Sequence, residues 1–95
     1  MIAVLTHHWA KDDKFDDAKN LLAKNGAAQS KHPGFIRRVA CVSLNDPTKI
    51  TTLVTWDSNE IYDDWKQSAQ RESIMKDAGH LWSKPPESER FDVVE

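Results

Sequence analysis

The sequence has a single cysteine, three glycines and no long apolar run in its 95 residues. Because Cys41 stands alone, both an internal disulfide and a zinc site built from several thiolates are excluded, and a reducing compartment is favoured. The apolar stretch near the start, Ile2 to Leu5, is far shorter than a signal-peptide core of about 7–15 residues or a membrane span of about 20. We therefore expect a soluble, cytoplasmic protein that does not engage a membrane.

An excess of charge of one sign is also lacking, since 13 basic residues face 15 acidic ones for a net charge of −2. Neither sign forms a long block, so no nucleic acid is expected as a partner. The length predicts one domain over residues 1–95. A chain this small buries only about 60–65% of its unfolded surface, so we expect help from a partner subunit or a ligand.

Hydrophobic periodicity, capping residues and turn residues predict the order of helices and strands. Asp12 or Asp13 is expected to cap the first helix, and Asp57 or Ser58 the second. Pro85-Pro86 excludes further helix near the end of the chain. The predicted elements are strands at 2–9, 35–44, 50–56 and 90–94, a helix from 12 or 13 to about 30, and a helix from 59 that resumes after Arg71 and ends at Gly79.

The predicted order is β-α-β-β-α-β, which is typical of a ferredoxin-like α+β domain. In this arrangement four antiparallel strands carry both helices on one face of the sheet, and the other face has no cover. The strands are apolar on both sides, so an uncovered face would leave a large exposed apolar patch. A second copy packed face to face covers it most simply, and we expect a homodimer formed through the sheet face.

Three segments carry a resemblance to a known family: His32-Pro33-Gly34-Phe35, Thr55-Trp56-Asp57-Ser58, and the run from Tyr62 to Ser68. In their order and spacing, the chain resembles the antibiotic biosynthesis monooxygenase superfamily of dimeric α/β barrels over nearly its whole length. That resemblance implies a small oxygenase. Members include cofactor-free oxygenases of quinols or polyketide aromatics, haem-degrading monooxygenases and small proteins of unknown role.

His7 and His8 are adjacent on the first strand, so their side chains point to opposite faces and only one can enter a pocket beneath the helices. The family register places His7 there, where it is the candidate catalytic base for a phenolic hydroxyl. Trp65 is the candidate wall that stacks on a flat aromatic substrate. A hydrogen-bonded structural role for His7 and plain core packing for Trp65 are the alternatives.

The expected pocket lies between the helices and the sheet. Trp56 can also anchor a strand-to-helix corner, and His80 can bind carbonyls at a helix end. Arg37 and Arg38 can bind an anionic group of a ligand or pair with acids across a dimer, and no metal site is expected. The candidate substrate-binding residues are Leu5, Phe15, Leu22, Trp56, Met75 and His80.

The haem-degrading branch of the family has an asparagine late in strand one, a tryptophan in helix two and a histidine about ten residues beyond it. Trp65 matches the tryptophan, whereas His7 falls on the asparagine position. Met75 falls on the histidine position, with His80 five residues further along. A thioether cannot replace an imidazole ligand without changing the electronics of the iron, so the cofactor is left open between none and haem.

The leading hypothesis is a small cofactor-independent or haem-assisted monooxygenase acting on a planar aromatic substrate. One alternative is a non-catalytic dimeric domain that binds a small hydrophobe in the same cavity. A second alternative is a purely structural dimer module, which predicts that side chains fill the cavity.

Overall fold

The computed structural model describes residues 1–95, and it contains four strands, three α-helices and one 3-10 turn. The strands are β1 (Ile2–Ala10), β2 (Phe35–Val42), β3 (Lys49–Trp56) and β4 (Trp82–Asp92). The helices are α1 (Phe15–Gln29), α2 (Asn59–Lys66) and α3 (Ala69–Met75), and the 3-10 turn is η1 (Gly79–Leu81). This order confirms the expected ferredoxin-like α+β fold, with the second helical segment broken into α2 and α3.

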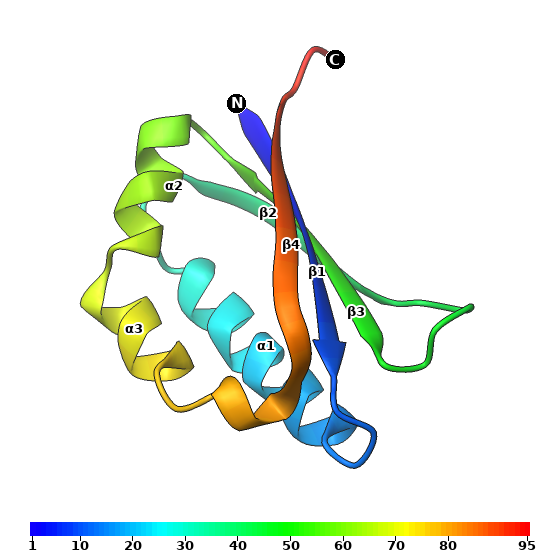
Figure 1. Cartoon of the computed structure of the whole chain (residues 1–95). Coiled ribbons are helices and arrows are strands. Elements are labelled where there is room, and N and C mark those ends of the chain that lie inside the picture. The colour runs from blue at the N-terminus through cyan, green and yellow to red at the C-terminus, as the bar shows by residue number, and fades with distance from the viewer.

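The four strands form one antiparallel sheet in the order β2-β3-β1-β4. All three helices cover the same face of this sheet, and the two termini lie at the same end of the molecule (Figure 1). We call the other face the open face; its ladder partners include Leu5, His7, Val39, Leu53 and Phe91. None of the helices is long and apolar enough to span a bilayer.

Serine hydroxyls set the boundaries of the second helical segment. The backbone N–H of Ile61 donates to the Ser58 hydroxyl at 3.2 Å, which confirms Ser58 as the cap of α2. Ser68 donates to the Trp65 carbonyl at 2.7 Å and accepts from the Arg71 N–H at 3.2 Å, so it both ends α2 and begins α3. The segment is therefore divided into two short helices, α2 and α3.

The expected cap of α1 by Asp12 or Asp13 is wrong. The helix begins at Phe15 without a side-chain cap, and the carbonyl of Lys14 accepts the first helical bond from Ala18. Both aspartates lie in the exposed turn before it.

The last strand is longer than expected and begins much earlier, because β4 starts at Trp82 and includes Pro85 and Pro86. Prolines are tolerated here since β4 is an edge strand and its pairing with β1 shifts register between His7 and Trp9, opposite the two prolines. Val94 lies beyond the strand. The prediction of a strand confined to 90–94 is therefore wrong at both ends.

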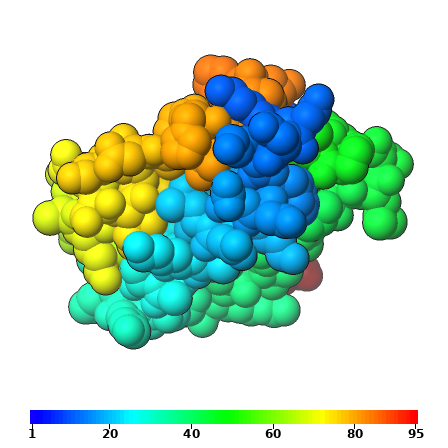
Figure 2. All heavy atoms as spheres, turned by 90° about the horizontal axis from the view of Figure 1, so that it is seen from below, coloured from blue at the N-terminus to red at the C-terminus, as the bar shows by residue number.

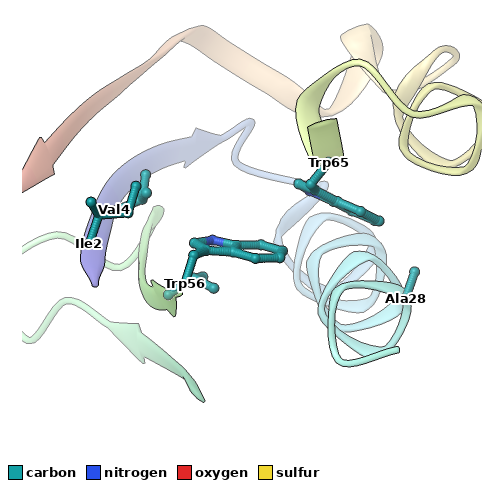
Figure 3. Close-up of a cluster of buried hydrophobic side chains, with 6 residues drawn as sticks. Ile2, Val4, Ala28, Trp56 and Trp65 are labelled. Carbon is teal, nitrogen blue, oxygen red and sulfur yellow. The ribbon is translucent and has the colours of Figure 1, made fainter. Parts of the chain in front are cut away.

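The core beneath the helices consists of two separate apolar clusters. Figure 3 shows the first, in which Trp56 and Trp65 lie between the sheet and α1. Its members are Ile2, Val4, Ala28, Val54, Trp56 and Trp65. Those of the second are Ala10, Ala18, Leu22, Ile50, Ala78 and Leu81. On β1 the polar residues Thr6 and His8 come between the clusters, so the interior is divided by a polar band.

The hairpin between β2 and β3 projects beyond the body of the molecule, at the right of Figure 2. Leu44 lies in this hairpin and is fully exposed. It belongs to neither core cluster.

Candidate functional site

A pocket of about 140 Å³ opens in the polar band between the two apolar clusters. Its walls come from all four strands and all three helices. The pocket is as large as a cavity of about 150 Å³ that holds one benzene molecule. The lining residues are Val4, Thr6, His8, Leu22, Asn25, Gln29, Arg38, Thr52, Val54, Tyr62, Trp65, Lys66, Arg71, Met75, Pro86 and Ser88.

The histidine in this pocket is His8, so the expected placement of His7 beneath the helices is wrong. Side chains alternate along a strand, and buried Ile2 and Val4 fix the inward phase of β1, which His8 shares. His7 points to the open face, where its Nδ1 lies 2.7 Å from the hydroxyl of Thr51. A catalytic role for His7 stays a prediction, and it would have to operate on the open face.

Four of the expected substrate-binding residues lie outside this pocket. Leu5 shares the outward phase of His7, and both line a shallow hollow of the open face. Phe15 packs against the second apolar cluster. Trp56 is completely buried behind the pocket wall, and exposed His80 has its Nδ1 3.0 Å from the Asp77 carbonyl. The prediction that they line the pocket between helices and sheet is wrong for this reason.

The other two expected substrate-binding residues, Leu22 and Met75, do line the pocket, as does Trp65, the expected stacking wall. Trp65 is 1% exposed and projects from α2, with Trp56 stacked behind it (Figure 3). The edge of His32 meets both indole rings, with centroid separations of 5.9 Å to Trp56 and 5.7 Å to Trp65. Contacts with Trp56 and His32 thus fix the position of the Trp65 ring in the pocket wall.

His8 is uncharged at neutral pH. Burial lowers its pKa from 6.5 to about 4, and the charges of Arg71, Arg38 and His7 act in the same direction. Its ring packs against Trp82 with centroids 5.0 Å apart, and its Nδ1 is buried without a hydrogen-bond partner. A neutral imidazole with an unused ring nitrogen can accept a proton or a hydrogen bond from a ligand.

Arg38 reaches from β2 under α1, where its Nη2 donates to the Leu22 carbonyl at 2.9 Å. Gly26 makes the approach possible, because a Cβ at that position would lie 2.5 Å from Cζ of Arg38. Burial lowers the pKa of Arg38, yet the guanidinium stays charged. The neighbouring Arg37 is exposed.

The pocket is cationic, with Arg38, Lys66 and Arg71 in its walls and no aspartate or glutamate. None of these three forms an ion pair; the ion pair in the structure joins Arg90 and Asp63 at 2.8 Å, outside the pocket. A negatively charged ligand would supply the missing counter-charge.

Unused acceptors and a phenol complete the chemistry of the walls. The side-chain oxygens of Asn25 and Gln29, one turn apart on α1, are buried without partners. Burial raises the pKa of Tyr62, so its hydroxyl stays protonated and can donate a hydrogen bond. The pocket therefore offers cationic donors as well as neutral acceptors to one small ligand.

Sequence reasoning missed His8, Asn25, Gln29, Tyr62 and Arg71 as site residues. The signal that could have found His8 is a polar residue in the inward phase of a strand that also carries Ile2 and Val4. A buried polar side chain at a core position points to a site more directly than an apolar one does.

Comparisons with known proteins place these features in a family. The family model for antibiotic biosynthesis monooxygenases matches residues 1–77. A candidate antibiotic biosynthesis monooxygenase from Nitrosomonas europaea is similar over 100% of both chains, with a TM-score of 0.90 at 17% identity. SnoaB, a cofactor-independent oxygenase from Streptomyces nogalater, has a TM-score of 0.87 at 11% identity over 99% of this chain and 93% of its own.

A conserved protein from Methanosarcina mazei has a TM-score of 0.87 at 21% identity, over 95% of this chain and 89% of its own. No curated protein sequence matches this chain. At these identities the solved structures establish a shared fold.

Proposed function

The chain belongs to the antibiotic biosynthesis monooxygenase family, and from that premise we propose that it is a cofactor-independent oxygenase of a single-ring phenol or quinol. One observation carries the proposal: an uncharged His8 with a free Nδ1 lines the same small pocket as Arg38 and Arg71. SnoaB, which has the same fold, is described as cofactor-independent. A purely structural module predicts a filled interior, which an open pocket of about 140 Å³ does not support.

In the proposed reaction, His8 takes the proton of a substrate hydroxyl. A histidine with a pKa of about 4 is a weak base in the empty pocket. However, the same arginine charges that lower its pKa also favour ionisation of a phenol, and the resulting phenolate then favours the protonated imidazole. Proton and negative charge are thus separated, because the proton moves to His8 while the charge stays on a ring inside a pocket whose walls are cationic.

The ionised ring is electron-rich and reacts with dioxygen. Electron transfer and carbon–oxygen bond formation at a ring carbon next to the phenolate give a peroxide anion, which takes up the proton held by His8 and becomes a hydroperoxide. Loss of the ring hydrogen with cleavage of the oxygen–oxygen bond releases water and leaves a new carbonyl. A quinol plus dioxygen gives a hydroxyquinone plus water, so the quinol supplies all four electrons and no further reductant is needed.

A haem does not fit this pocket. The cavity of about 140 Å³ is the size of one benzene ring, and a porphyrin is several times larger. The side chains in the pocket wall from α3 are Arg71 and Met75, and His80 is exposed outside the pocket. The proposed chemistry is therefore derived from the protein side chains and the substrate alone.

We further propose that residues 1–95 act as one domain that pairs into a homodimer through the open face. Leu53 and Phe91 are each 41% exposed on that face, which also carries Leu5 and Val39, and an exposed apolar patch marks an interaction site. Pairing two open faces would bury them, complete a barrel-like dimer and add stability to a small chain. The lone, exposed thiol of Cys41 supports our proposal that the protein works in the reducing cytoplasm.

The proposed function is tested by measuring oxygen uptake with methylhydroquinone and the purified protein, without added metal or cofactor. We expect the hydroxyquinone as product and no release of oxygen on addition of catalase, because the second oxygen atom leaves as water. His8→Gln should reduce turnover by about 100-fold or more. His7→Gln, the matched control on the other face, should retain it. Binding of methylhydroquinone without oxygen uptake would establish a binding protein instead.

A further inference from the structure

Arg38 is a half-buried cation with spare hydrogen-bond donors. One N–H of its guanidinium is used on the Leu22 carbonyl, and no other partner is present. A guanidinium presents its donors as a planar fork that matches a carboxylate with two parallel bonds. Arg38 lines the pocket, so its remaining N–H groups can bind a carboxylate there.

Gly26 leaves the space that the Arg38 guanidinium occupies. Any side chain at residue 26 would collide with Cζ and Nη1 of Arg38, because both atoms lie 2.5 Å from the point that a Cβ would occupy. A glycine inside a helix lowers helix stability relative to alanine. Gly26 thus lowers the stability of α1 at the point where the Arg38 guanidinium packs against the helix.

A hollow beside the pocket carries the same charge as the pocket itself. A hollow at the corner between α2 and α3 shares Lys66, Arg71 and Met75 with the pocket and adds Lys76, with Glu72 as its single acid. A cleft lined by one sign of charge raises the local concentration of ligands with the opposite charge. An anion would therefore be attracted to this corner of the molecule and stabilised by the arginines of the pocket wall.

The unpartnered acceptors in the pocket wall require a hydrogen-bond donor on the ligand, whereas the arginines require an anionic group. Asn25 Oδ1 and Gln29 Oε1 have no partners and can only accept, and His8 Nδ1 is a third acceptor in the tautomer protonated at Nε2. A carboxylate cannot supply a donor, whereas a hydroxyl can. One small ligand satisfies both sets of groups if it carries an acid group together with a hydroxyl group.

From this arrangement we infer that the substrate is a hydroxylated single-ring aromatic acid, whose carboxylate binds Arg38 and Arg71 while its hydroxyl meets the acceptors of α1 and His8. The inference rests on the proposed use of this pocket and adds the charge of the substrate. Trp65 provides a face for the ring.

Calorimetric titration of the purified protein with 4-hydroxybenzoate, 4-hydroxybenzamide and benzoate tests each part without requiring turnover. We expect 4-hydroxybenzoate to bind at least about tenfold more tightly than the neutral amide, because only the acid makes charge-assisted bonds. It should also exceed benzoate, which lacks the hydroxyl. Raising NaCl from about 0.1 to 1 M should weaken binding of the acid and leave the amide unchanged. Equal binding of acid and amide would overturn the inference.

Two pairs of variants locate the effect. Arg38→Gln should abolish the preference for acid over amide, while Arg37→Gln, one residue away and exposed, should keep it. Gly26→Ala should reduce the same preference by displacing the guanidinium without removing its charge. Gly79→Ala is its control, since a Cβ there meets nothing within 4 Å. Thermal melts verify folding; Arg38→Gln should not lower the melting temperature, because it removes a cation without a counter-charge.

The outcomes separate this inference from the proposed function. Tight, Arg38-dependent binding of 4-hydroxybenzoate, with no oxygen uptake from any hydroxylated acid or quinol, would support the inference and refute the oxygenase. Turnover of methylhydroquinone with no preference for acids would do the reverse.

Discussion

Trp56 and Trp65 stack with their ring centroids 6.2 Å apart and their planes inclined by 26°. Only Trp65 lines the pocket, although both rings are almost completely buried. The two indoles therefore differ in role: Trp56 packs only in the core, whereas Trp65 packs in the core and also lines the pocket.

Replacing each indole with a smaller aromatic ring tests this division. Trp65→Phe should cost about 1 kcal/mol of stability, whereas Trp65→Ala should cost about 3–5 kcal/mol through a new cavity. Trp65→Phe should also weaken binding of 4-hydroxybenzoate in calorimetry, while Trp56→Phe, the matched control, should lower stability similarly and leave binding closer to that of the wild type. Unchanged binding by Trp65→Phe would assign Trp65 to the core alone.

Acid sensitivity should trace to His8. Its folded-state pKa of about 4 lies below the ordinary 6.5, so as pH falls through 6.5 the unfolded chain takes up a proton that the folded chain refuses. From about pH 7.5 to about pH 5 this should remove about 2 kcal/mol of stability. Denaturant unfolding at both pH values should show a smaller loss for His8→Gln, while His7→Gln behaves as the wild type. An identical pH dependence in His8→Gln would contradict the assignment.

The dimer proposal makes a prediction about two exposed leucines. Leu53 lies on the open face, whereas Leu44 lies in the projecting hairpin and is even more exposed. Leu53→Glu should place a charge inside the interface and convert the dimer to a monomer of 10.9 kDa in multi-angle light scattering. Leu44→Glu should leave the dimer intact. A stable monomeric wild type at micromolar concentration would disprove the proposal.

Gly34 joins α1 to β2 with a φ of +90°, a region that side chains rarely adopt. A Cβ there would also lie 2.5 Å from Cδ1 of Ile61 on α2. Gly34→Ala should therefore lower stability by about 2 kcal/mol or more, which urea unfolding can measure. Gly79→Ala, in open space, should change stability by much less. Equal effects of the two substitutions would show that Gly34 is not required by this junction.

The order of the elements could be predicted from sequence because its signals are local. Ser58 directly precedes α2, which it caps. The turn at Gly34 lies between a helical pattern before it and a strand pattern after it. The phase of β1 could not be predicted from its apolar residues, since Ile2 to Leu5 are apolar at every position and leave both faces equivalent. Shifting the assumed register of β1 by one residue places His7 instead of His8 on the face beneath the helices. The correct register becomes apparent only from the pairing of β1 with β3 and β4.

The remaining parts of the site depend on contacts between distant segments. Arg38 lines the pocket only because Gly26, on another element, leaves room for its guanidinium. Most of β4 could not be predicted, since its sequence contains two prolines and many charged residues, and its strand conformation comes from the ladder with β1. Such features follow from tertiary pairing, which one sequence does not display.

The two prolines of β4 have a further consequence for the behaviour of the newly made chain. An edge strand offers free N–H groups on which the strand of another molecule can grow into an intermolecular sheet. Pro85 and Pro86 lack these donors, and Glu87, Glu89 and Arg90 add charge along the same strand. This edge is therefore a poor template for strand addition. In the proposed dimer, copies would therefore associate through the open face and not by extending the sheet at the β4 edge.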